Sequence, residues 1–291
     1  MRWQGGRRSS NVEDRRGRRA VGRGAKLGGV GGIIVVVIAI VMALMGKDPS
    51  EFLSAASNAG ATGGGATQSG PVAPNPGEDR LADFVSVVLA STEDTWTNVF
   101  QSRGQVYQPP RLVLFRGEVD SACGMTSAAV GPFYCPPDKQ VYIDLSFFDD
   151  LDRRFGAPGD FAQAYVVAHE VGHHLQTLMG ISQRVRQQKR GLPEVQANQL
   201  SIRQELQADC FAGVWAHHAN RRQQILEPGD VEEGMQAASA IGDDTIQRRA
   251  HGRVSPESWT HGASEQRVRW FRIGMQVGTI EACDTFNAAQ L

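Results

Sequence analysis

Residues 160–180 read DFAQAYVVAHEVGHHLQTLMG and contain the pattern His-Glu-x-x-His inside a run that predicts one helix. Residues four apart stand one above the other on a helix, so the imidazoles of His169 and His173 are expected to reach one metal ion. Glu170 is turned by about 100° from His169, which lets it face a metal-bound water without being a ligand itself. The stretch therefore predicts a hydrolytic metal site on a helix.

A third ligand is needed, because zinc in a hydrolytic site takes three protein ligands and keeps one position open. The extended metzincin motif is excluded, since Gln176 and Met179 stand where its Gly and His would be. The alternative is a glutamate from a separate helix, and ELQAD at 205–209 fits it. Glu205 and Asp209 share a helix face, so Glu205 can bind zinc while Asp209 accepts a hydrogen bond from a ligand histidine.

These residues predict the hydrolysis of peptide bonds. Two neutral imidazoles and one carboxylate leave a Zn²⁺ site with a charge of +1, enough to bring the pKa of a bound water near 7. Glu170 is expected to take the proton of that water and pass it to the leaving amine. His261 lies in a loop just before a predicted helix. It is a candidate donor to the oxyanion of the tetrahedral intermediate, and a hydrogen-bonded structural histidine is the alternative.

Charge is distributed unevenly along the 291 residues, although the formal net charge is only -1. Residues 1–26 carry nine basic side chains and two acidic ones, a net charge of +7 that leaves -8 for the rest. Residues 27–45, LGGVGGIIVVVIAIVMALM, contain no charged side chain and would span roughly 28 Å as a helix, close to the thickness of a bilayer core. They predict an uncleaved transmembrane signal anchor with a cytoplasmic basic head and an external domain. A cleaved signal peptide is the competing interpretation.

The chain after the apolar stretch divides into two parts. Residues 46–79 are rich in Gly, Ala, Ser and Pro and predict a flexible stalk. Residues 80–291 have the length of one ordinary domain. The basic head has a rival interpretation as a nucleic-acid-binding arm, but Trp3 is its only aromatic residue, and we expect no nucleic-acid partner.

All four cysteines lie in the predicted external domain, where an oxidising compartment favours disulfides over free thiols. Cys123 and Cys135 flank a short segment and are expected to pair, which leaves Cys210 for Cys283. Four cysteines permit three pairings, and four buried free thiols are the alternative. Their spacing fits no CxxC zinc or redox motif.

The rest of the domain predicts a mainly helical α+β fold. Helices are expected at about 80–101, from Asp160 to Gly180, after Pro193, from Asp230, and from Ser264 to the end of EQRVRWFRIGMQ. The helix after Pro193 is predicted as either one long helix or two. Short strands are expected at 111–115, 128–134 and 140–148, and Pro136–Lys139 predicts a hairpin turn between the last two.

Several separated stretches together resemble the bacterial family of neutral zinc metallopeptidases, which are membrane-anchored proteins with one HExxH. The stretches are AYVVAHEVGHHLQ, ELQADCFAGVWAHH, GPFYCPPDKQVYIDLSFF, IGDD and WTHGASEQR. The resemblance covers about residues 80–286 and implies a zincin-like fold, with His169, His173 and Glu205 as ligands and Glu170 as the catalyst. It also implies that Val141 to Leu145 form the edge strand that pairs with an extended substrate.

Two function classes follow from the sequence. The first is a zinc endopeptidase that acts on a peptide or protein of the cell envelope and is tethered to the outer face of the cytoplasmic membrane. The second is a non-catalytic envelope protein in which zinc or the fold presents a binding surface. The intact HExxH and ELQAD favour the enzyme, because a binding protein has no chemical need for Glu170.

Overall fold

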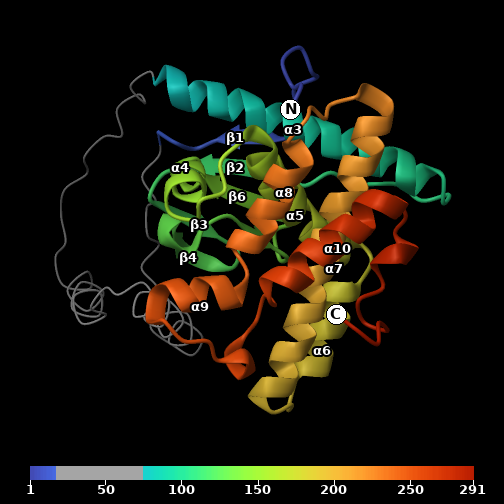
Figure 1. Cartoon of the computed structure of the whole chain (residues 1–291). Helices are drawn as coiled ribbons and strands as arrows, with labels where there is room; N and C mark the ends of the chain where they lie inside the picture. Colours follow the sequence, from blue (N-terminus) through green and yellow to red (C-terminus); the bar gives the residue numbers. More distant parts are fainter. Residues whose placement is uncertain (18–74) are drawn as a thin grey trace.

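Helices form most of the fold, and a small mixed sheet packs beside them (Figure 1). The structure is a computed structural model that describes residues 1–17 and 75–291. The mainly helical α+β class predicted from the sequence is confirmed. The helices are α3 (Pro76–Gln101), α4 (Ser146–Arg153), α5 (Asp160–Leu178), α6 (Ile181–Lys189), α7 (Glu194–Gln223), α8 (Asp230–Ala240), α9 (Asp243–His251) and α10 (Ser264–Val277).

The main sheet has the strand order β1-β2-β6-β5. β1 pairs with β2 and β2 with β6 in parallel, whereas β5 runs antiparallel to β6 across the predicted hairpin turn. β3 and β4 form a separate antiparallel hairpin that the sequence analysis did not predict. The strands are β1 (Val12–Asp14), β2 (Arg111–Phe115), β3 (Glu118–Ser121), β4 (Gly124–Ser127), β5 (Phe133–Cys135) and β6 (Gln140–Asp144).

Two strand predictions were too long. Residues 128–130 form a short 3-10 helix, and only 133–135 become β5. The predicted strand 140–148 ends at Asp144 and α4 begins at Ser146, because the Asp144 carboxylate accepts hydrogen bonds from the Ser146 backbone N–H and hydroxyl and turns the chain. The interpretation of Val141–Leu145 as an edge strand is also wrong, since β6 lies between β2 and β5.

The helical part was predicted more closely. The stretch after Pro193 is one helix of 30 residues, α7. Gly159, rather than Asp160, occupies the N-cap of α5, so that Asp160 is the first helical residue. The helix α6 was not predicted. α5 lies in the centre of the fold, where it packs against α3, α7 and α8, and α10 packs along α7 (Figure 1).

Residues 1–17 pack on the domain, which the prediction of a separate basic head at 1–26 did not anticipate. β1 completes the sheet beside β2, and the residues Met1 and Trp3 are each only 8% exposed. The predicted membrane span at 27–45 and the stalk up to residue 74 lie outside the described residues. Among residues 1–17 and 75–291, no helix combines the length and the apolar character needed to cross a bilayer.

Both predicted disulfides are present. Cys123 is bonded to Cys135, which ties β5 to the turn between β3 and β4. Cys210 is bonded to Cys283, which ties α7 to the C-terminal segment. All four cysteines are therefore in disulfides, and the alternative of four free thiols is wrong.

Candidate metal centre

The two histidines of the HExxH pattern lie side by side on α5, and Glu205 faces them from α7. Their ring centroids are 4.8 Å apart. The Nε2 atom of His169 is 3.3 Å from one carboxylate oxygen of Glu205, and the Nε2 atom of His173 is 3.4 Å from the other. The structure therefore brings together the three residues that the sequence predicted as a ligand set, although His169 and Glu205 are 36 positions apart in the sequence.

A glycine allows this approach of α7 to α5. A Cβ atom on Gly172, in the middle of the HExxH pattern, would lie 3.0 Å from both the Cα and the carbonyl oxygen of Ala208. That separation is shorter than ordinary van der Waals contact, so a larger residue at 172 would push the helices apart. Because Ala208 is within one turn of Glu205, the same displacement would carry the carboxylate away from the histidines.

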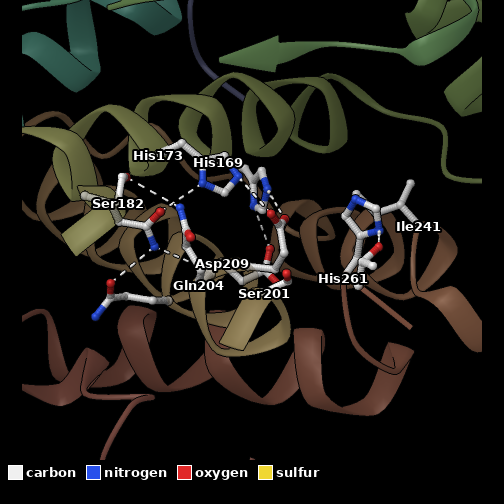
Figure 2. Close-up of polar contacts among 12 residues, drawn as sticks. His169, His173, Ser182, Ser201, Gln204, Asp209, Ile241 and His261 are labelled. Carbon is white, nitrogen blue, oxygen red and sulfur yellow. Dashed lines mark hydrogen bonds and ion pairs between the residues drawn. The ribbon is translucent and has the colours of Figure 1, made fainter. Parts of the chain in front are cut away.

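Hydrogen bonds fix the tautomer of each histidine. His169 donates from Nδ1 to Asp209 at 2.8 Å, and His173 donates from Nδ1 to the amide oxygen of Gln176 at 2.9 Å (Figure 2). The Gln176 amide nitrogen donates to the carbonyl oxygen of Gln204 at 2.6 Å, which sets the direction of the amide. Both Nε2 atoms therefore face Glu205 and are the atoms left for a metal ion.

This arrangement fits a cation. The ligand atoms of His169, His173 and Glu205 all lie within 4.8 Å of one another, so two lone pairs and a carboxylate converge on one space. Without a cation, they repel unless the imidazoles are protonated. Two imidazoles and a carboxylate with one open position form the donor set of a catalytic zinc site.

Protons take the place of the cation in the metal-free chain. Burial lowers the pKa of His169, but the charge and hydrogen bond of Asp209, with Glu205, outweigh it and raise the pKa to about 10. Burial likewise opposes protonation of His173, and Glu205 raises the pKa of this imidazole above its ordinary value. A divalent cation at the two Nε2 atoms must therefore displace protons.

We predict that zinc binding at pH 7 releases at least one proton per chain. The pKa of His169, raised to about 10, means that this imidazole must lose a proton to bind the metal, and Glu205 raises the pKa of His173 as well. Zinc affinity should accordingly rise as the pH increases through neutrality. Calorimetric titration in two buffers with different ionisation enthalpies measures the number of protons. Binding without proton release would show that the imidazoles are neutral in the free protein and would contradict this prediction.

Glu170 lies beside the three converging residues and is not one of them. Its side chain lines the same pocket, and the residue is only 7% exposed. Burial raises the pKa of Glu170 above its ordinary value, while His169 and His173 oppose that shift. A carboxyl group with a raised pKa, next to a site with an open position, suits a general base.

A buried network behind His169 holds it in position. Arg267 from α10 donates to both carboxylate oxygens of Asp209, from Nε and from Nη2, at 2.9 Å each. The hydroxyl of Tyr165 also donates to Asp209. Burial raises the pKa of Asp209, but Arg267 and His169 outweigh it and lower the pKa to about 2. Asp209 is therefore a carboxylate that accepts from His169, as its sequence position predicted.

Sequence reasoning missed Arg267, although it lies in a stretch that the resemblance included. It is 58 residues from Asp209, and no local pattern connects the two. Gly274 allows their approach, because a Cβ atom there would overlap the carbonyl oxygen of Cys210 on α7. The burial of Arg267, only 2% exposed, is seen in the structure and has no counterpart in the sequence pattern of the helix.

His261 lies at the same pocket as the metal centre (Figure 2). Its Nδ1 atom is 3.2 Å from the Oδ1 atom of Asp243. The other carboxylate oxygen, Oδ2, accepts the backbone N–H groups of Thr260, His261 and Gly262. This loop therefore holds the imidazole with its other nitrogen away from Asp243. The role of an oxyanion donor stays a prediction.

His174, the next residue after His173, points away from the metal centre. Its Nε2 atom donates to the carbonyl oxygen of Gln108 at 2.6 Å, and its Nδ1 atom accepts from the hydroxyl of Tyr134 at 3.1 Å. Burial lowers the pKa of His174 to about 4, so the ring is neutral. His174 thus joins β5 to the helix that carries the candidate ligands.

The metal centre opens into a pocket of about 470 Å³. Backbone and side chains of the segment 130–134 form one wall, so that β5 is the edge strand at the site. Away from the metal centre the lining is largely apolar, and it includes Phe133, Phe147, Phe155, Val166, Ile241 and Ile246.

Comparison with known proteins agrees with the resemblance. The family described as "Putative neutral zinc metallopeptidase" matches residues 1–286. The chain belongs to this family. The uncharacterized protein YpfJ of Escherichia coli (strain K12) is 48% identical to it over 292 residues, which cover 99% of each chain.

More distant relatives share the larger part of the sequence. The uncharacterized protein Rv2575 of Mycobacterium tuberculosis (strain ATCC 25618 / H37Rv) is 44% identical over 218 residues, 72% of this chain and 73% of its own. No solved structure matches this chain. The family name supports a zinc-dependent peptidase at the level of the family. The arrangement of the candidate ligands comes from the structure alone.

Proposed function

We propose that the protein is a zinc-dependent endopeptidase that hydrolyses peptide or protein substrates of the cell envelope. One observation carries the proposal: the Nε2 atoms of His169 and His173 and the carboxylate of Glu205 converge on one space, with the buried Glu170 beside it. A non-catalytic protein that binds zinc would need the three converging ligands. It would not need a buried carboxyl group beside them.

His169, His173 and Glu205 would hold the zinc ion, and Asp209 and Gln176 would keep the two imidazoles in the binding tautomer. Bound zinc would supply a Lewis acid that polarises the scissile carbonyl and makes a water acidic. Glu170 accepts the proton of the attacking water and delivers it to the leaving nitrogen. Its burial maintains a pKa that suits both transfers.

Two features of the pocket would position a peptide. β5 is the edge strand at the site, so an extended substrate can add to the sheet through its backbone. The apolar part of the pocket lining, with Phe155 and Ile246, would take an apolar side chain. His261, which lines the same pocket, would donate a hydrogen bond to the developing oxyanion.

The cell envelope is proposed for two reasons. The two disulfides favour an oxidising compartment for the domain. The apolar stretch 27–45, which lies outside the described residues, would attach the protein to the cytoplasmic membrane.

The experiment that tests the metal site measures zinc per chain in the purified full-length protein, with Glu205→Ala and Glu194→Ala compared. Glu194 lies on the same helix and is exposed, so it is the matched control. We expect about one zinc in the parent and in the control, and a clear loss in Glu205→Ala, because two imidazoles alone bind zinc weakly. A folded parent that binds no zinc would contradict the proposal.

Activity is tested on the same preparations with a broad peptide library. Cleavage should stop when a chelator removes the metal and return when zinc is added. A fully zinc-loaded parent that cleaves no peptide in the library would favour the non-catalytic alternative.

A further inference from the structure

The N-terminal segment, residues 1–17, has the contacts of an integral part of the domain. Trp3 packs edge-to-face against Phe84 of α3 with ring centroids 5.3 Å apart. The backbone N–H of Ser9 donates to the carbonyl oxygen of Ser86, and β1 pairs in register with β2 from Val12 to Asp14. The segment therefore contributes both to the apolar core and to the sheet.

Its basic side chains pair with acidic side chains of α3. Arg7 donates to Glu93 at 2.9 Å and to Asp94 at 2.7 Å. Arg8 forms a two-point contact with Asp83, at 2.8 and 2.7 Å. Arg16 reaches Asp79 at 3.0 Å. The excess of positive charge at the start of the chain thus has partners in the acidic domain.

The amino group of Met1 lies in an acidic pocket where α5 and α8 begin. It is 2.5 Å from a carboxylate oxygen of Asp160, 3.2 Å from one of Asp230 and 3.5 Å from one of Glu227. Carboxylate oxygens of Asp160, Asp230 and Glu233 lie within 4.8 Å of one another, an arrangement that calls for a cation. Burial opposes the charge of the amino group, but Asp160 and Asp230 raise its pKa above the ordinary value.

Two carboxylates of this pocket are also tied to the backbone around it. Asp230 accepts the backbone N–H of Glu227 at 2.7 Å, and Glu233 accepts that of Phe161 at 3.1 Å. Arg2 adds a backbone hydrogen bond to Ile225 at 2.8 Å. The pocket is thus built into the starts of two helices, one of which carries His169 and His173.

We propose that residues 1–17 are held permanently on the domain, with Met1 seated against the acidic pocket, and that they therefore lie in the same compartment as residues 75–291. A single membrane crossing between the two would put a bilayer between groups that are in hydrogen-bonding contact. The family match, which begins at residue 1, agrees with a segment that belongs to the fold. This inference is independent of the proposed peptidase activity.

Thiol labelling in cells tests the shared compartment. All four cysteines of the chain are in disulfides, so one introduced cysteine is the single free thiol. Ser10→Cys and Gln105→Cys place it at exposed positions of the N-terminal segment and of the domain. Spheroplasts that express each full-length variant are treated with a membrane-impermeant maleimide before or after lysis.

We expect both variants to react to the same extent in intact spheroplasts. Reaction of both only after lysis would equally support a shared compartment. Reaction of Gln105→Cys before lysis and of Ser10→Cys only after it, or the reverse, would overturn the proposal.

Hydrogen exchange of the purified full-length protein tests the acidic pocket. In the double variant Asp160→Asn, Asp230→Asn, amides of residues 2–14 should exchange at least tenfold faster than in the parent. Asp120→Asn, an exposed change on β3, is the control and should leave these rates unchanged. Unchanged exchange in the double variant would contradict the role of the pocket. Should that variant fail to fold, the labelling experiment still decides the proposal.

Discussion

Replacement of Glu170 by glutamine is expected to lower peptide hydrolysis by about 10³-fold while zinc remains bound, since a positioned general base contributes roughly 10²- to 10⁴-fold. Glutamine keeps the size of the side chain and removes its ability to accept a proton. Glu170 is outside the set of converging ligand atoms, so the metal content should stay near that of the parent.

The measurement compares steady-state cleavage and zinc content of the parent, Glu170→Gln and Glu118→Gln. Glu118 is an exposed residue of β3 and is the matched control, for which we expect unchanged activity. Hydrolysis at the parental rate by zinc-loaded Glu170→Gln would show that another group accepts the proton. Loss of zinc along with activity would instead assign Glu170 to the ligand set.

Replacement of Arg267 by methionine is expected to destabilise the protein by about 3–5 kcal/mol, because it leaves the Asp209 carboxylate buried without its main partner. Arg267 also donates to the carbonyl oxygen of Ile241 at 3.2 Å. The variant removes this hydrogen bond as well. The free energy of unfolding is measured by denaturant titration with a chelator present, so that zinc binding does not add to stability.

The exposed Arg272, on the same helix, supplies the control Arg272→Met, for which we expect a change below about 0.5 kcal/mol. In the double variant Asp209→Asn, Arg267→Met the two losses should not add, because each single change removes the same contact. Strict additivity would contradict a direct interaction.

Asp209→Asn alone should also weaken zinc binding by about 10- to 100-fold, since residue 209 no longer accepts the hydrogen bond of His169 as a carboxylate.

The candidate ligands could be predicted from the sequence because their relations are local. His169 and His173 are separated by one helical turn, and so are Glu205 and Asp209, and helical geometry alone places each pair on one face. The sequence also identified which pair supplies imidazoles and which supplies carboxylates. The disulfides could be predicted for a similar reason, since the short separation of Cys123 and Cys135 favoured their pairing and left Cys210 for Cys283.

Contacts between distant segments could not be predicted in this way. The ion pair of Arg267 with Asp209 depends on how α10 crosses α7, and that crossing depends on small residues such as Gly274 that have no periodic signal. The edge strand at the site was assigned wrongly, because strand order follows from the pairing of β2 with β6 and not from strand propensity.

The N-terminal segment shows most clearly the difference between what the local sequence predicts and what contacts between distant segments decide. Its composition determined that residues 1–26 are basic and that the rest of the chain is acidic. Composition does not specify which charges meet, so the pairing of Arg7 and Arg8 with α3 and of the Met1 amino group with Asp160 and Asp230 was decided only by the tertiary structure. Local periodicity thus determined the helices and the ligand pairs of this protein. Long-range packing decided which helices meet, because it depends on the summed shape and charge of segments far apart in the chain.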